Sequence, residues 1–69
     1  MKISVLGSGA FGTALAISLT NSRNSVTLWG RNPKRVNAFS KDRENKYRLP
    51  NCPFPPSLCV TSDLELACD

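Results

Sequence analysis

The sequence predicts an α/β fold with a parallel sheet, in which strands and helices alternate in the order β-α-β-α-β. Three observations support this prediction. An apolar run at residues 3–6 leads into a glycine-rich turn and an alanine-rich segment. Two further short apolar runs follow, at residues 26–29 and 58–61, with room for a connection before each. Strands that alternate with helices pair in parallel through right-handed crossovers, so the chain is expected to form one layered unit.

The first expected strand spans residues 2–6, and its nearly unbroken apolar character is typical of a central parallel strand. Glycines at positions 7, 9 and 12 follow at once, and strand, glycine turn and helix in this order form the dinucleotide-binding fingerprint. The first glycine permits a sharp turn, the second lets a pyrophosphate approach the backbone, and the third lets the helix pack closely on the strand. The unit is therefore expected to be a partial Rossmann-type fold, truncated before its second half.

The start of the following helix favours an anion, because its first N–H groups lack intrahelical partners and lie at the positive end of the helix dipole. A tight turn that binds nothing is the alternative interpretation. The cofactor-binding residues expected in this turn are Gly7, Ser8, Gly9, Ala10, Phe11 and Gly12.

The first helix is expected over residues 10–21, and Asn and Ser residues end it. Apolar spacing predicts that its buried face consists of Phe11, Ala14, Leu15 and Leu19. The second strand is expected at residues 26–29. A second helix should begin with Asn32 as its cap and Pro33 in its first turn, and continue to about residue 45.

Four prolines between residues 47 and 57 exclude a helix or a central strand there, so this stretch is expected to be an extended connection. The third strand is expected at residues 58–61. Ser62 and Glu65 have the spacing of a capping box, which places the start of a third helix at about Asp63. With 69 residues, the chain has room for about half of a doubly wound domain. We therefore expect the N-terminal part of an NAD(P)-binding domain over residues 1–69, cut inside the third helix, with the substrate domain absent.

Composition excludes several other functions. Nine Lys and Arg against five Asp and Glu give a net charge of +4, but no basic stripe with interleaved aromatic residues marks a nucleic-acid surface. The absence of histidine excludes a Cys/His zinc site or a histidine-based triad within these residues. We expect Cys52, Cys59 and Cys68 to be small buried or half-buried thiols in a reducing cytosol. No run approaches the ~20 apolar residues needed to cross a membrane, so a cytoplasmic protein is expected.

The end of the second strand bears on cofactor choice. NAD-type fingerprints carry an acidic residue there that binds the ribose 2′-hydroxyl. This sequence has no Asp or Glu at residues 28–32 and carries Arg31 instead. Arginine binds phosphate bidentately and stacks on flat rings, so NADP, or tolerance of both NADP and NAD, is favoured. A solvent-exposed Arg31 without a ligand is the alternative.

Residues 1–16, MKISVLGSGAFGTALA, closely resemble the N-terminus of bacterial NAD(P)-dependent glycerol-3-phosphate dehydrogenases. Further matches follow in order: VTLWGR at residues 26–31, Glu44-Asn45 with Leu49-Pro50, and TSDL at residues 61–64. The resemblance implies a two-domain enzyme that interconverts glycerol 3-phosphate and dihydroxyacetone phosphate by hydride transfer, and so makes a glycerophospholipid precursor. The implied partners are a dinucleotide and a small phosphorylated substrate, with a homodimer left open for the full-length enzyme.

The resemblance also assigns site residues. Ala10 and Phe11 contact the pyrophosphate and nicotinamide end of the cofactor, and Arg31 and Asn32 contact the adenosine end. The family usually has a tyrosine near the cofactor immediately before Leu-Pro. Here Arg48 holds that place and is counted as cofactor-binding, while the tyrosine stands one position earlier, at Tyr47.

The family's catalytic lysines and substrate-phosphate site correspond to positions beyond residue 69, so no catalytic residue is assigned. A standalone nucleotide-binding module and a non-functional gene remnant remain the alternative interpretations.

Overall fold

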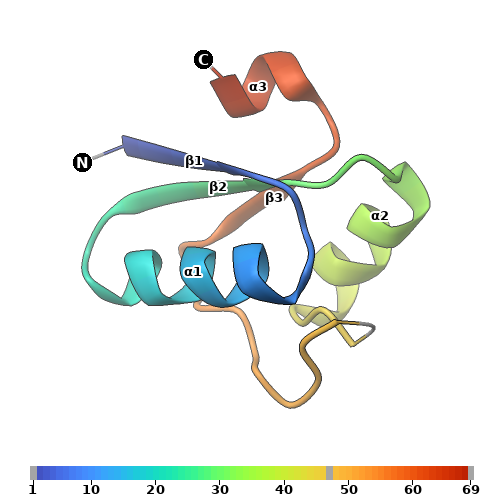
Figure 1. Ribbon diagram of the computed structural model, residues 1–69, viewed down its shortest axis with the longest axis horizontal. Coiled ribbons are helices and arrows are strands. Elements are labelled where there is room, and N and C mark those ends of the chain that lie inside the picture. The colour runs from blue at the N-terminus through green and yellow to red at the C-terminus, as the bar shows by residue number, and fades with distance from the viewer. Residues whose placement is uncertain (1, 47, 69) are drawn as a thin grey trace.

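The computed structural model describes residues 2–46 and 48–68. Along this part of the chain, strands and helices alternate, and the connection from α2 to β3 is long (Figure 1). The elements are β1 (Lys2–Leu6), α1 (Ala10–Asn21), β2 (Ser25–Trp29), α2 (Pro33–Asp42), β3 (Cys59–Thr61) and α3 (Leu64–Cys68). The predicted β-α-β-α-β order is confirmed.

The described strands form a parallel sheet in the order β1-β2-β3. The register pairs Ile3 with Val26 and Leu28 with Val60. The central strand of this sheet is β2, so the expectation that β1 is central is wrong for the described residues. Exposed and half-buried residues alternate along β1, as they do where one face of a strand is covered more fully than the other.

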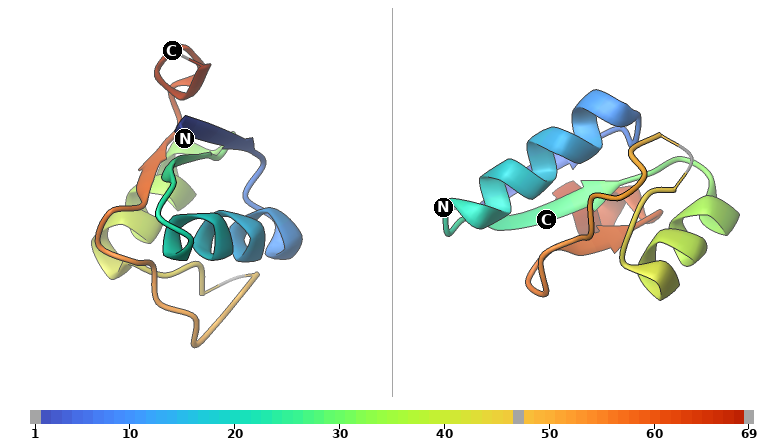
Figure 2. Two further views of the ribbon diagram at one scale, coloured as in Figure 1. Left: turned by 90° about the vertical axis from the view of Figure 1, so that its left-hand side faces the viewer. Right: turned by 90° about the horizontal axis from the view of Figure 1, so that it is seen from below.

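Helices cover both faces of the sheet. Helices α1 and α2 lie on one face, and the short α3 lies on the other (Figures 1 and 2). The hydroxyl of Ser4 in β1 donates to the carbonyl of Ala67 in α3. This hydrogen bond joins α3 to the first strand of the sheet. The chain therefore passes to the opposite face of the sheet after β3, whereas the helices that follow β1 and β2 share one face.

The core lies between the sheet and the α1/α2 layer. Its buried residues come from both helices, from β2 and from the connection before β3: Ala16, Val26, Leu28, Phe39, Phe54 and Leu58. Ile3 and Val5 of β1 pack against this cluster from the edge of the sheet. The proline-rich connection thus contributes two core side chains.

The face of α1 that packs on the sheet differs from the predicted one. Phe11 is 80% exposed and Leu15 is 40% exposed, whereas the buried residues of the helix are Thr13, Ala16 and Thr20. A Cβ on Gly12 would overlap the carbonyl oxygen of Gly7, so the helix approaches the turn very closely. Near that joint small side chains lie beneath the helix and Phe11 and Leu15 point outward, while Ile17 and Leu19 farther along the helix pack against the core.

The second helix begins as predicted and ends earlier. The side-chain oxygen of Asn32 accepts hydrogen bonds from the N–H groups of Lys34 and Arg35, and Pro33 occupies the first turn. The helix ends at Asp42, not near residue 45, because Arg43 adopts a left-handed conformation with φ of 56°. Its guanidinium donates to the carbonyls of Pro55 and Leu58 at 2.8 and 2.9 Å, which stabilises this early exit.

The connection from residue 43 to residue 58 contains no helix or strand in the part that the structure describes, which confirms the irregular connection predicted for residues 47–57. The helix predicted to about residue 45 and the strand predicted from residue 58 do not extend into it. It does form an isolated antiparallel bridge between Asn45 and Leu49. Tyr47 lies outside the described residues.

Two further predictions are corrected at β3 and α3. The cap of α3 is Asp63, whose carboxylate accepts from the N–H groups of Glu65 and Leu66, so the capping role predicted for Ser62 is wrong. The Ser62 carbonyl instead accepts from the indole N–H of Trp29 at 3.1 Å. Cys52 is half-buried as expected, but Cys59 is exposed.

Candidate functional site

Two strand-to-helix turns meet at the carboxyl edge of the sheet. The N–H of Gly7 donates to the carbonyl of Trp29 at 2.9 Å, and the N–H of Gly30 donates to the carbonyl of Thr61 at 3.0 Å. These bonds extend the sheet by one residue beyond β1 and β2. They place the turn after β1 beside the turn after β2, where ligands bind in open parallel sheets.

The turn after β1 is shaped by three glycines in different ways. Gly7 has φ of +124°, a conformation that other residues rarely adopt. Gly9 is extended, and a Cβ built on it would meet nothing within 4 Å. Gly12 is instead packed against the backbone of Gly7. The first two glycines therefore border open space, and the third closes the joint between helix and strand.

The N-terminus of α1 has no side-chain cap. Gly9 is the N-cap residue and supplies no side-chain acceptor, and the first turn contains no acidic residue. Ala10 and Phe11 are exposed there. The backbone carbonyl of Gly9 accepts from Thr13 at 2.9 Å, as a regular helix start requires. N–H groups without intrahelical partners at such a start bind anions well.

The turn after β2 lies against the first turn. A Cβ on Gly30 would lie 2.7 Å from Val36 Cγ2 and 3.0 Å from Ser8 Oγ, so only glycine fits between them. Arg31 and Asn32 follow and are both exposed. The structure thus brings the Ser8 side chain beside the start of the Arg31 segment. Sequence reasoning gave Gly30 no role, since its contact with Ser8 joins two turns that are distant in sequence.

Asn45 is a site residue that sequence reasoning missed. Its side chain is fully buried, at 0% exposure. The amide Nδ2 donates to the carbonyl of Ser8 at 2.8 Å and to Thr13 Oγ1 at 3.0 Å, and the hydroxyl of Thr13 donates to the same Ser8 carbonyl at 3.3 Å. A local sequence pattern could not predict this hydrogen bond, because it joins residues 37 positions apart.

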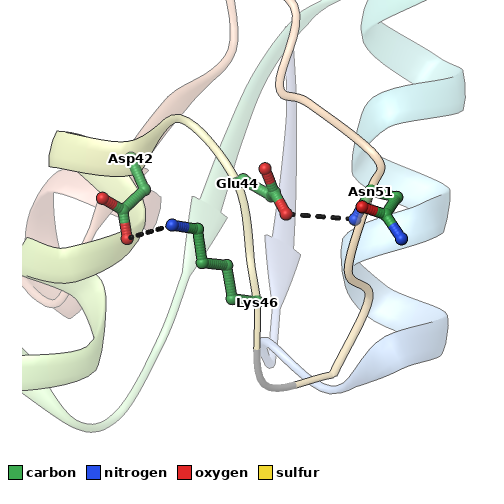
Figure 3. A network of polar contacts seen from close by, with 4 residues as sticks. All are labelled: Asp42, Glu44, Lys46 and Asn51. Atoms are coloured by element: carbon green, nitrogen blue, oxygen red, sulfur yellow. Dashed lines mark hydrogen bonds and ion pairs between the residues drawn. The ribbon is translucent and has the colours of Figure 1, made fainter.

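The same side chain holds the segment that carries Arg48. Asn45 Oδ1 accepts from the N–H of Arg48 at 3.2 Å, while the Arg48 residue is exposed. Two outer contacts brace this segment (Figure 3): Lys46 Nζ lies 3.8 Å from Asp42 Oδ2, and Glu44 Oε2 accepts from the N–H of Asn51 at 3.0 Å. Arg48 is therefore connected to the glycine turn through Asn45.

The residues at this edge fit a dinucleotide. The open space beside Gly7 and Gly9 is the cradle that a Cβ would fill, and the uncapped helix start supplies N–H donors for a pyrophosphate. Arg31 stands at the end of β2, where an adenosine ribose lies in such folds. Of the predicted residues, the structure gathers the glycine turn and the β2 end at one edge, and links Arg48 to them by one buried amide.

A separate groove of about 400 Å³ lies between α1 and the connection that follows α2, bordered by Ile17, Ser18, Leu49 and Cys52 among others. It is formed by the middle and end of the helix, so it is distinct from the uncapped helix start. Within residues 2–46 and 48–68, no helix has both the length and the apolar character to cross a bilayer.

Comparison with known proteins gives a consistent result. The family described as NAD-dependent glycerol-3-phosphate dehydrogenase N-terminus matches residues 2–69. Glycerol-3-phosphate dehydrogenases [NAD(P)+] of Colwellia psychrerythraea and Tolumonas auensis are 50% and 51% identical, and each match covers 96–97% of this chain. The crystal structure of glycerol-3-phosphate dehydrogenase from Coxiella burnetii superposes with a TM-score of 0.91 at 36% identity, over 96% of this chain. The chain spans 20% of the length of each of these proteins.

Proposed function

Because the chain belongs to the family of NAD-dependent glycerol-3-phosphate dehydrogenases, in which it matches the N-terminal region, we propose that it is the NAD(P)-binding part of such an enzyme. The whole enzyme would interconvert glycerol 3-phosphate and dihydroxyacetone phosphate. In this proposal residues 1–69 form the first part of the Rossmann domain, and the substrate domain lies in the remainder of the enzyme. The observation that carries the proposal is the open, uncapped glycine turn at the carboxyl edge of the sheet.

The turn after β1 would hold the pyrophosphate. Gly9 lets the phosphates approach the backbone, and the first N–H groups of α1 donate to them. Ser8 borders the same space from the turn side, and Ala10 and Phe11 lie on the exposed first turn toward the nicotinamide end. When bound, the nicotinamide exchanges a hydride with the substrate carbon. The task of residues 1–69 is to bind and orient that cofactor.

The turn after β2 would hold the adenosine end. Arg31 supplies a guanidinium for a 2′-phosphate or for stacking on adenine, and no carboxylate in this turn repels a phosphate. The side-chain oxygen of Asn32 already caps α2, so this residue contacts the cofactor with its remaining amide atoms or its backbone. Arg48 approaches from the segment that Asn45 holds. We propose that the site accepts NADP, and NAD less tightly.

The test uses a full-length dehydrogenase that begins with residues 1–69. Joining these residues to the part of the Colwellia psychrerythraea relative beyond the matched segment gives such a protein, called here the full-length chimera. Titration with NADPH and NADH should show saturable binding, and NADPH should be oxidised when dihydroxyacetone phosphate is added. A chimera that folds but binds neither cofactor contradicts the proposal.

The isolated 69-residue chain provides the control. It should show no dehydrogenase turnover, because the residues that meet the substrate are expected outside it. It should also be marginally stable, since β1 has an unpaired edge and Leu6, Leu64 and Leu66 expose apolar surface. Turnover by the isolated chain would assign the whole activity to residues 1–69. Binding without turnover in both proteins would favour a standalone nucleotide-binding module.

We also propose a cellular location, a metabolic role and an oligomeric state for the full-length enzyme. A glycerol-3-phosphate dehydrogenase of this kind supplies a precursor of glycerophospholipids from the cytoplasm, and the full-length enzyme is proposed to form a homodimer. Fractionation of cells that express the full-length protein, and its mass in solution, test these two statements directly.

A further inference from the structure

We propose that Asn45 is the positioning residue of the cofactor site: its buried amide turns the Ser8 carbonyl inward, so that the N–H of the next residue, Gly9, faces the pyrophosphate. The inference rests on the proposed dinucleotide binding and adds a residue to it. Asn45 lies 36 positions beyond Gly9 and belongs to a different segment of the fold.

The chemistry around Asn45 allows only one orientation of its amide. The carbonyl of Ser8 accepts a hydrogen bond and requires the NH₂ end, at 2.8 Å. The backbone N–H of Arg48 donates one and requires the oxygen end, at 3.2 Å. Exchanging the two ends would place the amide oxygen against the Ser8 carbonyl oxygen and the NH₂ group against the N–H of Arg48, and neither pair can form a hydrogen bond. The side chain is fully buried, so water does not replace a lost partner, and breaking either bond is costly.

The Ser8 carbonyl has two buried donors. Asn45 Nδ2 and the hydroxyl of Thr13 both point at it, and both side chains have 0% exposure. A peptide unit is planar, and in the trans form its C=O and N–H point in opposite directions. The described residues contain no cis peptide bond. The N–H of Gly9 therefore points away from Asn45 and Thr13, toward the exposed side of the turn.

An inward carbonyl matters because the turn must bind an anion. Rotation of the peptide between Ser8 and Gly9 would present a carbonyl oxygen, which repels phosphate, in place of an N–H, which attracts it. Glycine at position 9 offers little steric resistance to such a rotation. The turn therefore needs an outside contact to hold its orientation, and Asn45 provides it from the segment that also carries Arg48.

The test compares the same substitution at two places in the full-length chimera. Asn45→Asp keeps the oxygen that accepts from Arg48 and removes the amide donor to Ser8. Asn24→Asp is the matched control, because the Asn24 amide also donates to a backbone carbonyl, that of Leu19 at 3.0 Å, at the opposite end of α1. We expect Asn45→Asp to weaken NADPH binding by about tenfold or more, and Asn24→Asp to change it by less than about twofold.

A neutral variant removes the effect of the added charge. Thr13→Val deletes one donor to the Ser8 carbonyl at nearly constant volume, and should weaken NADPH binding by about threefold. If Asn45→Asp does not fold, this variant decides the question.

A second ligand separates positioning from general damage. Adenosine 2′-monophosphate, which lacks the pyrophosphate, should compete with NADPH equally well in parent and variants. Equal weakening of NADPH and of the monophosphate would overturn the proposal in favour of a purely structural role, as would unchanged NADPH binding in both Asn45→Asp and Thr13→Val. Failure of the parent chimera to bind NADPH would instead refute the proposed function itself, and this inference with it.

Discussion

The two strand-to-helix turns at the carboxyl edge of the sheet have the same topology and opposite local chemistry. The turn after β2 leads into a capped helix and leaves no open space: Asn32 caps α2 with its side chain, and Pro33 occupies the first turn. Gly30 is enclosed by Val36 and by Ser8 of the neighbouring turn. The turn after β1 is incomplete: α1 starts from Gly9 with no side-chain cap, and the space beside Gly7 and Gly9 is open. A side-chain cap stabilises a helix by about 1 kcal/mol relative to alanine but by only about a few tenths of a kcal/mol relative to glycine, so the glycine cap of α1 costs little stability.

This difference separates a helix start that its own side chain caps from a helix start that no side chain caps. In α2 the Asn32 side chain accepts from two of the N–H donors at the helix start, whereas in α1 no side chain accepts from the corresponding donors. The start of α1 is instead joined to the rest of the fold by close packing at Gly12 and by the buried hydrogen bonds of Asn45 and Thr13. Four substitutions in the full-length chimera test this comparison, from the largest expected effect to the smallest.

Gly9→Val should remove cofactor binding and leave the fold intact. The extended backbone of Gly9 suits valine, and a Cβ there meets no protein atom within 4 Å, so the side chain enters only the space proposed for the pyrophosphate. We expect the dissociation constant for NADPH to rise more than about 100-fold, which is roughly 2.7 kcal/mol, with an unchanged thermal midpoint. Tight NADPH binding by this variant would place the pyrophosphate elsewhere.

Gly12→Ala should have the opposite effect and damage the fold. The added methyl group would overlap the carbonyl of Gly7, so the helix or the turn must move. Overpacking of this kind costs about 1–3 kcal/mol of unfolding free energy, measurable by urea denaturation. Gly9→Ala is the matched control, since the same methyl group three positions earlier enters open space. Equal stability of the two variants would remove the distinction between the packed and the open glycine.

Arg31→Ala tests the turn after β2 as the adenosine end. Charge-assisted bonds to a 2′-phosphate contribute about 1.5–3 kcal/mol, so NADPH should bind about 10- to 100-fold more weakly, nearer the lower figure because Lys34 and Arg35 follow closely. NADH should change little. Dissociation constants for both cofactors at one ionic strength provide the measurement, because salt screens phosphate contacts.

The control for this substitution is Arg23→Ala, which removes an exposed arginine from the far end of α1. Equal losses for NADPH and NADH would assign Arg31 to the adenine ring. No loss for either cofactor would leave it as a surface arginine.

Asn32→Ala should have the smallest effect, a loss of about 1 kcal/mol in unfolding free energy, because it removes the oxygen that accepts from Lys34 and Arg35. Asn32→Ser, which retains a capping oxygen, should recover most of that loss in the same denaturation experiment. If both variants weaken NADPH binding equally, the Asn32 amide contacts the cofactor in addition to capping α2. An unchanged stability of Asn32→Ala would contradict the contrast between the two turns.

Some predictions from sequence were accurate because the interactions behind them join residues only a few positions apart. Local turn and helix chemistry accounts for the bounds of α1, the cap of α2 at Asn32 and the absence of a helix or strand in the described part of residues 47–57. The same local patterns misplaced the cap of α3. Ser62 and Asp63 are both good capping residues, but the carboxylate of Asp63 is the one that accepts from the helix start. The Ser62 carbonyl accepts a hydrogen bond from the Trp29 indole N–H.

Other features depended on contacts between distant segments, and no pattern of spacing contains them. Apolar periodicity placed Leu19 of α1 correctly against the core. It was wrong for Phe11, Ala14 and Leu15, which are exposed, because the approach of Gly12 to Gly7 selects small residues for the buried side there. The buried position of Asn45 beneath Ser8 follows from the path of the whole α2-to-β3 connection. The sequence thus contains, in local form, the order of strands and helices along the chain and the glycine turn. The tertiary structure alone determines which side chains hold that turn, since burial and long-range hydrogen bonds exist only after the segments have packed together.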